Sequence, residues 1–198
     1  YHSSSHLERL FTSLCAQTAQ DWTLHVRDHS EDPAEVARVQ ASLEKSGLSF
    51  TFEVGKNIGF ASGHNALFAK HEASFVALVN PDIDVEPEYY ERLLQALKTH
   101  PELAAVQGAL LRGARGSVTV DSLGLLPLGM GDIRDLGAGE RLSAWETRLS
   151  VGLLPVFGVS GAAPVFRRTS LEAVASERAP FLDERFFMYG EDLDLCLV

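Results

Sequence analysis

The chain has 198 residues, which suits one ordinary domain that buries a substantial core. With 45% hydrophobic and 22% charged residues, its composition is that of a globular protein and excludes a chain that is disordered as a whole. The net charge of -10 argues against a nucleic-acid-binding protein, because such proteins gather basic residues on one face. A phosphate group bound here must therefore be met by a metal ion or by backbone amides.

The two cysteines, Cys15 and Cys196, lie far apart and form no C-x-x-C pair. Neither a disulfide framework nor a zinc site is predicted, and a reducing cytoplasm is the expected compartment. No apolar run approaches the roughly 20 residues that cross a bilayer, and the N-terminus has no signal-peptide pattern. We expect any peripheral association with the inner face of the membrane to arise outside this segment.

The first 111 residues alternate between helical and strand-like patterns. Leu7, Leu10, Phe11 and Leu14 recur at helical spacing after residues 3–5, three serines that are candidates for the helix cap. Alternating apolar residues, glycines and prolines mark the other elements. In chain order we predict helices over residues 7–15, 33–45, 65–72 and 87–98, and strands over residues 22–28, 48–54, 74–79 and 103–111.

The second part of the chain begins with residues 112–140, which are rich in glycine and weakly periodic. This predicts a long loop or irregular excursion with a functional role. A strand over 156–167, a helix over 169–175 and a helix from 191 follow. The alternation predicts an α/β fold in which right-handed crossovers build a mostly parallel sheet with helices on both faces. We expect one domain, residues 1–198, truncated at both ends, because no strand precedes the first helix and the last helix is cut short.

Carboxylates follow the apolar run of residues 75–79, where the sequence continues as Asn80-Pro81-Asp82-Ile83-Asp84. In open α/β sheets, ligands bind at the carboxyl ends of strands. A divalent cation such as Mg or Mn is usually held there by one or two carboxylates together with substrate phosphates. Asp82 and Asp84 are therefore candidate metal ligands, and a simple turn or cap is the alternative.

Two further polar segments lie at predicted strand ends. Asp28 closes the strand over 22–28, where its carboxylate can accept a hydrogen bond from a base or ribose, whereas Asp32 before Pro33 is typical of a helix start. Residues 56–65 place two glycines and two asparagines at a strand-to-helix junction, where backbone amides can approach a ligand closely. This segment matches neither the P-loop pattern nor the dinucleotide-binding glycine pattern.

Paired carboxylates follow an aromatic cluster near the C-terminus. Residues 186–194 read FFMYGEDLD, in which Gly190 frees the backbone just before Glu191 and Asp192. Acidic residues are also favoured at any helix N-terminus, so the pair alone allows a plain structural interpretation. The seven histidines are scattered and no H-E-x-x-H pattern occurs, so zinc ligation is not indicated.

Read in order, five segments resemble those of family 2 glycosyltransferases, with the bacterial rhamnosyltransferase-like group as the closest branch. The similarity spans almost the whole chain, and the last segment is the most specific. The five segments are Asp28-His29-Ser30, residues 57–65, Asn80-Pro81-Asp82, residues 158–168, and residues 181–196, which read FLDERFFMYGEDLDLC.

The resemblance implies the GT-A fold, a nucleotide-binding α/β domain in which a sugar passes from a nucleoside diphosphate donor to an acceptor with inversion. It divides the chain into a nucleotide-binding half, about residues 1–111, and an acceptor-side half, about residues 112–198. The implied acceptor is a hydroxyl of a saccharide or a lipid-linked molecule, and the implied process is the synthesis of a cell-surface polysaccharide.

The resemblance also implies roles for individual residues. Asp82 matches the metal-binding last aspartate of the family's D-x-D element, in which Asn80 takes the first place, and Asp84 lies beyond that element. Asp192 is the implied catalytic base, and Glu191 is a positioning partner or acceptor contact. The implied donor-binding residues are Asp28, Asn57, Gly59, Gly63, Asn65 and Asn80, and the implied acceptor-binding residues are Ser160 and Gly161.

Two other functions are open at this point. A sugar-phosphate nucleotidyltransferase has a similar architecture, metal and carboxylates, but such enzymes usually open with a glycine-rich, basic phosphate loop that this sequence does not show. A non-catalytic nucleotide-sugar-binding module would keep the pocket without the chemistry. The joint presence of Asp82, Glu191 and Asp192 argues against such a module.

Overall fold

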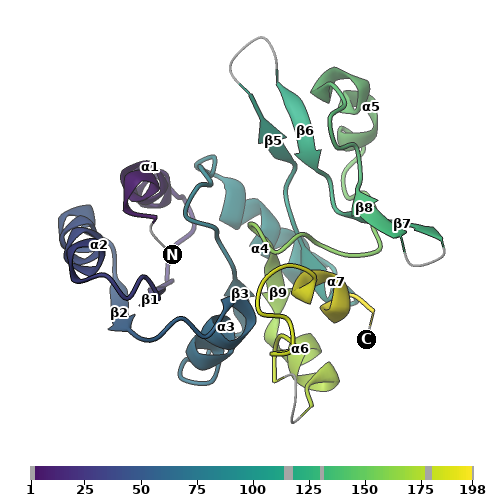
Figure 1. Cartoon of the computed structure of the whole chain (residues 1–198). Helices are drawn as coiled ribbons and strands as arrows, with labels where there is room; N and C mark the ends of the chain where they lie inside the picture. Colours follow the sequence, from purple (N-terminus) through teal and green to yellow (C-terminus); the bar gives the residue numbers. More distant parts are fainter. Residues whose placement is uncertain (1–2, 114–117, 130–131, 177–179, 198) are drawn as a thin grey trace.

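A computed structural model describes residues 3–113, 118–129, 132–176 and 180–197 of the chain (Figure 1). Helices and strands alternate along the first hundred residues, and two β-hairpins with two short helices follow. The helices are α1 (Ser4–Cys15), α2 (Pro33–Ser46), α3 (Phe60–Phe68), α4 (Tyr89–Thr99), the 3-10 helix η1 (Leu142–Ala144), α5 (Glu146–Leu149), α6 (Arg168–Val174) and α7 (Glu191–Leu195). The strands are β1 (Leu24–Asp28), β2 (Phe50–Val54), β3 (Phe75–Ala77), β4 (Ala105–Val106), β5 (Leu110–Arg112), β6 (Thr119–Ser122), β7 (Leu125–Gly129), β8 (Asp132–Asp135) and β9 (Val165–Arg167).

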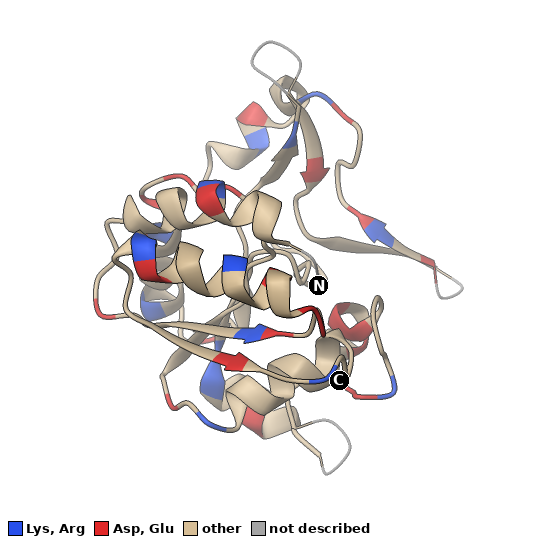
Figure 2. Cartoon of the chain, turned by 60° about the vertical axis from the view of Figure 1, so that its left-hand side comes forward, with Lys and Arg blue, Asp and Glu red and all other residues tan. Residues whose placement is uncertain are grey.

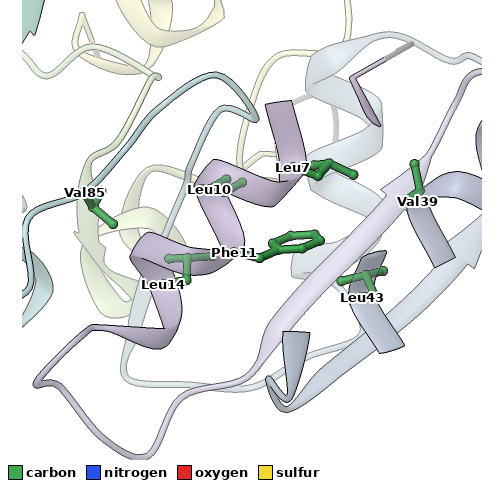
Figure 3. Packing of buried hydrophobic residues seen from close by; sticks show 7 residues of the cluster. All are labelled: Leu7, Leu10, Phe11, Leu14, Val39, Leu43 and Val85. Atoms are coloured by element: carbon green, nitrogen blue, oxygen red, sulfur yellow. The ribbon is translucent and has the colours of Figure 1, made fainter. Parts of the chain in front are cut away.

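The first core cluster lies between helices α1 and α2. Helix α1 buries four side chains at the spacing of one helical face, as predicted. Figure 3 shows Phe11 directed from α1 towards Val39 and Leu43 of α2, with Val85 on the other side of α1. Apolar side chains of the parallel strands β1 and β2 pack against the same cluster. This core fixes the carboxyl end of β1, which carries Asp28.

Helix α1 begins without the serine side-chain cap that we predicted. Ser3 takes the cap position, but its side chain makes no capping hydrogen bond. The buried carboxylate of Glu35 in α2 instead accepts hydrogen bonds from the N–H and the hydroxyl of Ser4, each at 2.7 Å. Burial alone would raise the pKa of Glu35, but the hydrogen bonds from Ser4 and Arg38 outweigh it and lower the pKa to about 2.

The α/β class is confirmed, but the expected mostly parallel sheet is not what forms. Strands β1 and β2 pair in parallel, whereas β9 lies antiparallel between β3 and β4 (Figure 1). Strands β3 and β4 therefore run in the same direction on either side of β9 without pairing with each other. Val165 and Phe166 of β9 are both buried, so this strand from far along the chain takes the central place. The remaining strands in the described ranges pair as two small antiparallel hairpins.

The described parts of residues 110–135 contain the paired strands β5–β6 and β7–β8, where the sequence predicted an irregular excursion. Val120 and Leu123 bury themselves against Trp145, which gives this part of the chain its own small core. Gly124 joins the two hairpins with a φ of +116°, and a Cβ there would lie 2.9 Å from the side chain of Val156. The weak periodicity reflects these frequent glycine turns rather than a lack of structure.

Helix α7 closes the described chain. It begins after Gly190, whose φ of +95° only glycine adopts readily, and carries Glu191, Asp192 and Asp194 in its first turn. Figure 2 shows this acidic helix, whereas the three longest helices, α1, α2 and α4, carry both signs of charge. Of the helices within the described ranges, none is both long and apolar enough to cross a membrane.

Candidate active site

The turn at residues 160–162 lies at the centre of the candidate site. Hydrogen bonds to its backbone join it to two distant segments, the end of β3 and helix α7. The N–H of Asn80, just beyond β3, donates to the carbonyl oxygen of Ala162 at 2.8 Å. The N–H of Gly161 donates to Oδ2 of Asp192 in α7 at 2.9 Å. The predicted donor-side, acceptor-side and catalytic residues Asn80, Gly161 and Asp192 are thus brought together at one turn.

The two adjacent carboxylates of α7 have different environments. Asp192 is partly buried, and its carboxylate accepts the N–H groups of Gly161 and Leu193. Glu191 is only 6% exposed, and its Oε2 atom has no hydrogen-bond partner among the described residues. Burial, reinforced by the negative charge of Asp192, raises the pKa of Glu191. Asp192 is therefore held towards the turn, while Glu191 is a buried carboxyl whose charged form is less favoured than in water.

The loop before α3 lies against the aromatic segment before α7. Gly59 has a φ of +89°, and a Cβ there would lie 2.5 Å from the carbonyl oxygen of Phe187. The same carbonyl accepts the N–H of Phe60 at 2.7 Å, and the Asn57 side chain accepts the N–H of Gly59 at 3.1 Å. Glycine is required at this position both by the backbone conformation and by the close approach. The predicted donor loop is thereby attached to the chain that leads into α7.

Gly63 makes room for the end of β1. A Cβ at Gly63 would lie 2.7 Å from Cε1 of His29, so the missing side chain lets the His29 ring pack on α3. The preceding residue, Asp28, is buried, and its Oδ1 atom accepts the N–H of Ser30 at 2.8 Å. Asp28 and Gly63 are therefore brought close to each other through His29.

Asn65 has a structural partner that the sequence did not reveal. Its Nδ2 atom donates to the carbonyl oxygen of Leu182 at 2.8 Å, and its Oδ1 atom accepts the N–H of Leu182 at 2.9 Å. Nδ2 also lies 3.0 Å from Oε1 of Glu184. The Asn65 side chain is buried and its amide is engaged at both ends. We therefore assign Asn65 to positioning the segment around Leu182 rather than to direct contact with the donor.

The two predicted metal ligands differ in their partners. Asp84 forms an ion pair with Arg9 of α1, which does not favour a metal-binding role. Asp82 is exposed, and within the described ranges no hydrogen bond or ion pair engages its carboxylate. No group of three or more His, Cys, Asp or Glu side chains that could hold a metal ion occurs in that part of the chain. Asp82 thus offers one free carboxylate, which fits a cation whose other ligands are phosphates and water.

Three contacts of the site were not predicted. They come from the backbone carbonyl of Phe187, the backbone of Leu182, and the side chain of Gln107, whose Oε1 atom accepts the N–H of Ser160 at 2.6 Å. The first two are backbone groups that any residue supplies, so no sequence signal marks them. Gln107 fell inside the strand predicted over residues 103–111, and because β4 ends at Val106 in the structure, its place at a strand end was not visible from the sequence.

The family model of glycosyl transferase family 2 matches residues 1–174 of the chain. The chain belongs to glycosyl transferase family 2. Two curated relatives, from Mycobacterium tuberculosis strains CDC 1551 / Oshkosh and ATCC 25618 / H37Rv, are both named N-acetylglucosaminyl-diphospho-decaprenol L-rhamnosyltransferase. Each is 27% identical over 212 aligned positions, which cover 98% of this chain and 66% of the relative. This family 2 chain thus spans about two thirds of the length of these relatives.

Family membership confirms the resemblance that the five motifs carried and agrees with a GT-A-like α/β fold. The matched range includes the predicted donor loop, the end of β3 and the turn at residues 160–162. Helix α7 lies beyond that range, so the assignment of its carboxylates depends on their contacts with the turn. Family 2 glycosyltransferases commonly use a divalent cation, and Asp82 is the residue whose surroundings suit one.

Proposed function

We propose that this family 2 glycosyltransferase moves a sugar, with inversion, from a nucleoside diphosphate-sugar to a hydroxyl of a saccharide or lipid-linked acceptor. The proposed process is the synthesis of a cell-surface polysaccharide. The hydrogen bond between Gly161 and Asp192 carries this proposal. It sets a carboxylate of α7 on the same turn that receives the N–H of Asn80 from the end of β3. A base and the strand end that leads to Asp82 are therefore linked through two consecutive residues, Gly161 and Ala162.

In the proposed reaction, the acceptor oxygen attacks the anomeric carbon as the bond from that carbon to the diphosphate oxygen breaks. Asp192 takes the proton that the acceptor hydroxyl loses, as a general base. The N–H of Gly161 orients the Asp192 carboxylate by binding Oδ2. Glu191 lies beside this base as a buried acid and helps to position it or the acceptor. Asp82 would hold a divalent cation, which supplies positive charge beside the departing diphosphate when bound.

The donor is proposed to lie along the loop before α3 and the end of β1. The close approach of Gly59 to Phe187 and of Gly63 to His29 keeps these backbone segments together. Helix α3 presents its N-terminus there, where backbone N–H groups and the helix dipole favour phosphate oxygens. Asp28 is proposed to contact the base, with Asn57 shaping the loop through its bond to Gly59.

The names of the two relatives suggest the first substrates to test. They make an activated L-rhamnose the first donor, and an N-acetylglucosaminyl-diphospho-polyprenol the first acceptor. Because the identity to these relatives is 27%, other nucleoside diphosphate-sugars belong in the same screen. A lipid-linked acceptor would bring the protein to the inner face of the membrane.

A transfer assay with the full chain, Mn²⁺ and a panel of nucleoside diphosphate-sugars tests the proposal. We expect a glycosylated acceptor, free nucleoside diphosphate and an inverted anomeric centre by NMR. Release of pyrophosphate from a sugar phosphate and a nucleoside triphosphate would instead indicate a nucleotidyltransferase. Tight donor binding by calorimetry, without turnover on any acceptor, would indicate a binding module.

A further inference from the structure

We infer that Gln107 is a positioning residue of this enzyme, which holds the turn at residues 160–162 where Gly161 meets Asp192. This inference rests on the proposed role of Asp192 as the base. Gln107 is partly buried and lies directly after β4, on the nucleotide-binding side of the chain. Its Oε1 atom accepts the N–H of Ser160 at 2.6 Å. The N–H groups of two consecutive residues are therefore bound by two side chains from different elements.

The other end of the Gln107 amide faces the hairpin region. Its Nε2 atom lies 3.4 Å from the carbonyl oxygen of Ser122 in β6, and 3.3 Å from that of Gly108. A glutamine side chain can make both contacts, because its amide accepts a hydrogen bond at the oxygen and donates one from the nitrogen. Gln107 thus connects the turn to the hairpins that form the acceptor-side half.

A second link runs beside the first. The hydroxyl of Tyr89 in α4 donates to the carbonyl oxygen of Ala163 at 2.8 Å and accepts the N–H of Gly108 at 3.0 Å. Gly108 follows Gln107, and Ala163 follows the turn, so the same two segments are joined at two points. With Tyr89 holding one side, the Gln107 side chain sets the orientation of the Ser160 peptide on the other.

Loss of the Gln107 carbonyl would leave the Ser160 N–H without its acceptor. The flanking residues Val159 and Ala163 are buried, so water cannot freely replace it, and an unpaired N–H in such a place is costly. The turn relieves this by rotating, which carries the neighbouring Gly161 N–H away from Asp192. The consequence is a misplaced base rather than a lost donor site.

The test compares Gln107→Leu, Gln107→Glu and a matched control, Gln17→Leu. Gln17 bridges in the same manner, donating to the carbonyl of Glu86 at 2.7 Å and accepting the N–H of Tyr90 at 3.1 Å, but it joins α1 to α4 outside the candidate site. We expect Gln107→Leu to lower kcat by about 10- to 100-fold, the effect of a small misplacement of a reacting group. Donor affinity by calorimetry stays within about twofold, because the donor loop is untouched. Gln107→Glu keeps the oxygen that accepts the Ser160 N–H but loses the Nε2 donor, so its kcat should lie between those of Gln107→Leu and the wild type. Gln17→Leu loses stability but keeps kcat.

An NMR experiment tests the hydrogen bond between Gly161 and Asp192 without measuring sugar transfer. In protein labelled with ¹⁵N-glycine, the Gly161 amide signal, identified through Gly161→Ala, should shift in Asp192→Asn, because the N–H then faces a neutral amide oxygen instead of a carboxylate. The same signal should also shift in Gln107→Leu and stay in place in Gln17→Leu. An unchanged Gly161 signal in Gln107→Leu, or equal kcat in the two leucine variants, would overturn the inference. If the wild-type protein transfers no sugar, the proposed function fails, and the Gly161 signal still decides whether Gln107 sets the turn.

Discussion

The backbone N–H of Gly161 donates a hydrogen bond of 2.9 Å to Oδ2 of Asp192. A Cβ at Gly161 would lie 3.6 Å from the Asp192 side chain, an ordinary contact, so space does not demand glycine there. The N–H, not the missing side chain, is what this position contributes. This distinguishes Gly161 from Gly59, where a Cβ would strike the carbonyl oxygen of Phe187.

The Asp192 base can be tested by removing its charge alone. Asp192→Asn keeps an oxygen that can accept the Gly161 N–H, so the fold and donor affinity should be retained. Transfer should fall by roughly 10²- to 10⁴-fold, the usual contribution of a general base. Initial rates at saturating donor and acceptor give this number, and Glu191→Gln is the neighbouring comparison with a smaller expected loss. Wild-type rates in Asp192→Asn beside an inactive Glu191→Gln would show that the two roles are reversed.

The buried carboxyl of Glu191 should lower the folding stability of the protein at neutral pH. Because its pKa is raised in the folded protein, its charged form is disfavoured there, and folding becomes less favourable as pH rises from the unfolded pKa through the folded one. Glu191→Gln should therefore raise the melting temperature at about pH 7.5, and the gain should vanish below about pH 4, where the wild-type carboxyl is protonated in both states. Melting curves of the two proteins at both pH values test this. A gain that is equally large at low pH would show that the effect is not the buried charge.

Local signals in the sequence predicted the elements whose ends are determined locally. Helix α2 begins at Pro33, as predicted, after Asp32, whose side chain accepts the N–H of Ala34. It ends at Ser46, one residue beyond the predicted end, and Gly47 follows with a φ of +72°. Helix α3 was placed too late because its start depends on Gly59 packing against Phe187, a contact between distant segments that no local pattern encodes. The central place of β9 follows from long-range burial and was missed for the same reason.

In the candidate site, too, local motifs could be predicted from the sequence, whereas long-range contacts could not. The ordered motifs correctly indicated the family and brought Asn80, Gly161 and Asp192 into one set, which the turn now connects. The side-chain partners could not be predicted, because the bond of Asn65 to Leu182 and the pairing of Asp84 with Arg9 each join a helix to a loop that is distant in sequence. The residue types indicated which chemistry the site can carry out. The packing of distant segments determines which of the polar side chains have no partner and are available to bind a ligand.

The two aspartates after β3 should respond differently to substitution. Asp82→Asn should remove the Mn²⁺ dependence of nucleoside diphosphate binding, because Asp82 is the one of the two whose carboxylate has no partner within the described ranges. Asp84→Asn breaks only the exposed pair with Arg9, so its effects on affinity and stability should be small. Calorimetry with Mn²⁺ and with EDTA measures both variants. Equal Mn²⁺ enhancement in wild type and Asp82→Asn would remove Asp82 from the metal site.

Gly59 should tolerate substitution less well than Gly47, although both have positive φ. At Gly47 no atom lies within 4 Å of the position that a Cβ would take, so Gly47→Ala carries the conformational strain alone, about 1–3 kcal/mol. Gly59→Ala adds a collision with the Phe187 carbonyl and should lose both more stability and donor affinity. Urea unfolding and donor titration of the two variants separate strain from contact. Normal donor affinity in a folded Gly59→Ala protein would contradict the assignment of this loop to the donor.

His64 should make the stability of the protein depend on pH between about 7 and 4. The ring packs edge-on against Phe60 in α3, with ring centroids 4.2 Å apart. Burial, together with the nearby His29, lowers the pKa of His64 to about 4, while an unfolded histidine titrates near 6.5. Between these values the unfolded chain binds more protons than the folded one, so the free energy of unfolding falls as pH falls.

For a partly exposed ring this loss should be about 1–2 kcal/mol between about pH 7.5 and about pH 5. Urea unfolding of wild type and His64→Gln at both pH values measures it, and the variant should lose correspondingly less stability on acidification. His6→Gln, at an exposed position of α1, is the matched control and should keep the wild-type dependence. If His64→Gln and wild type lose the same free energy, another group titrates in this range and the His64 ring is not buried in its neutral form.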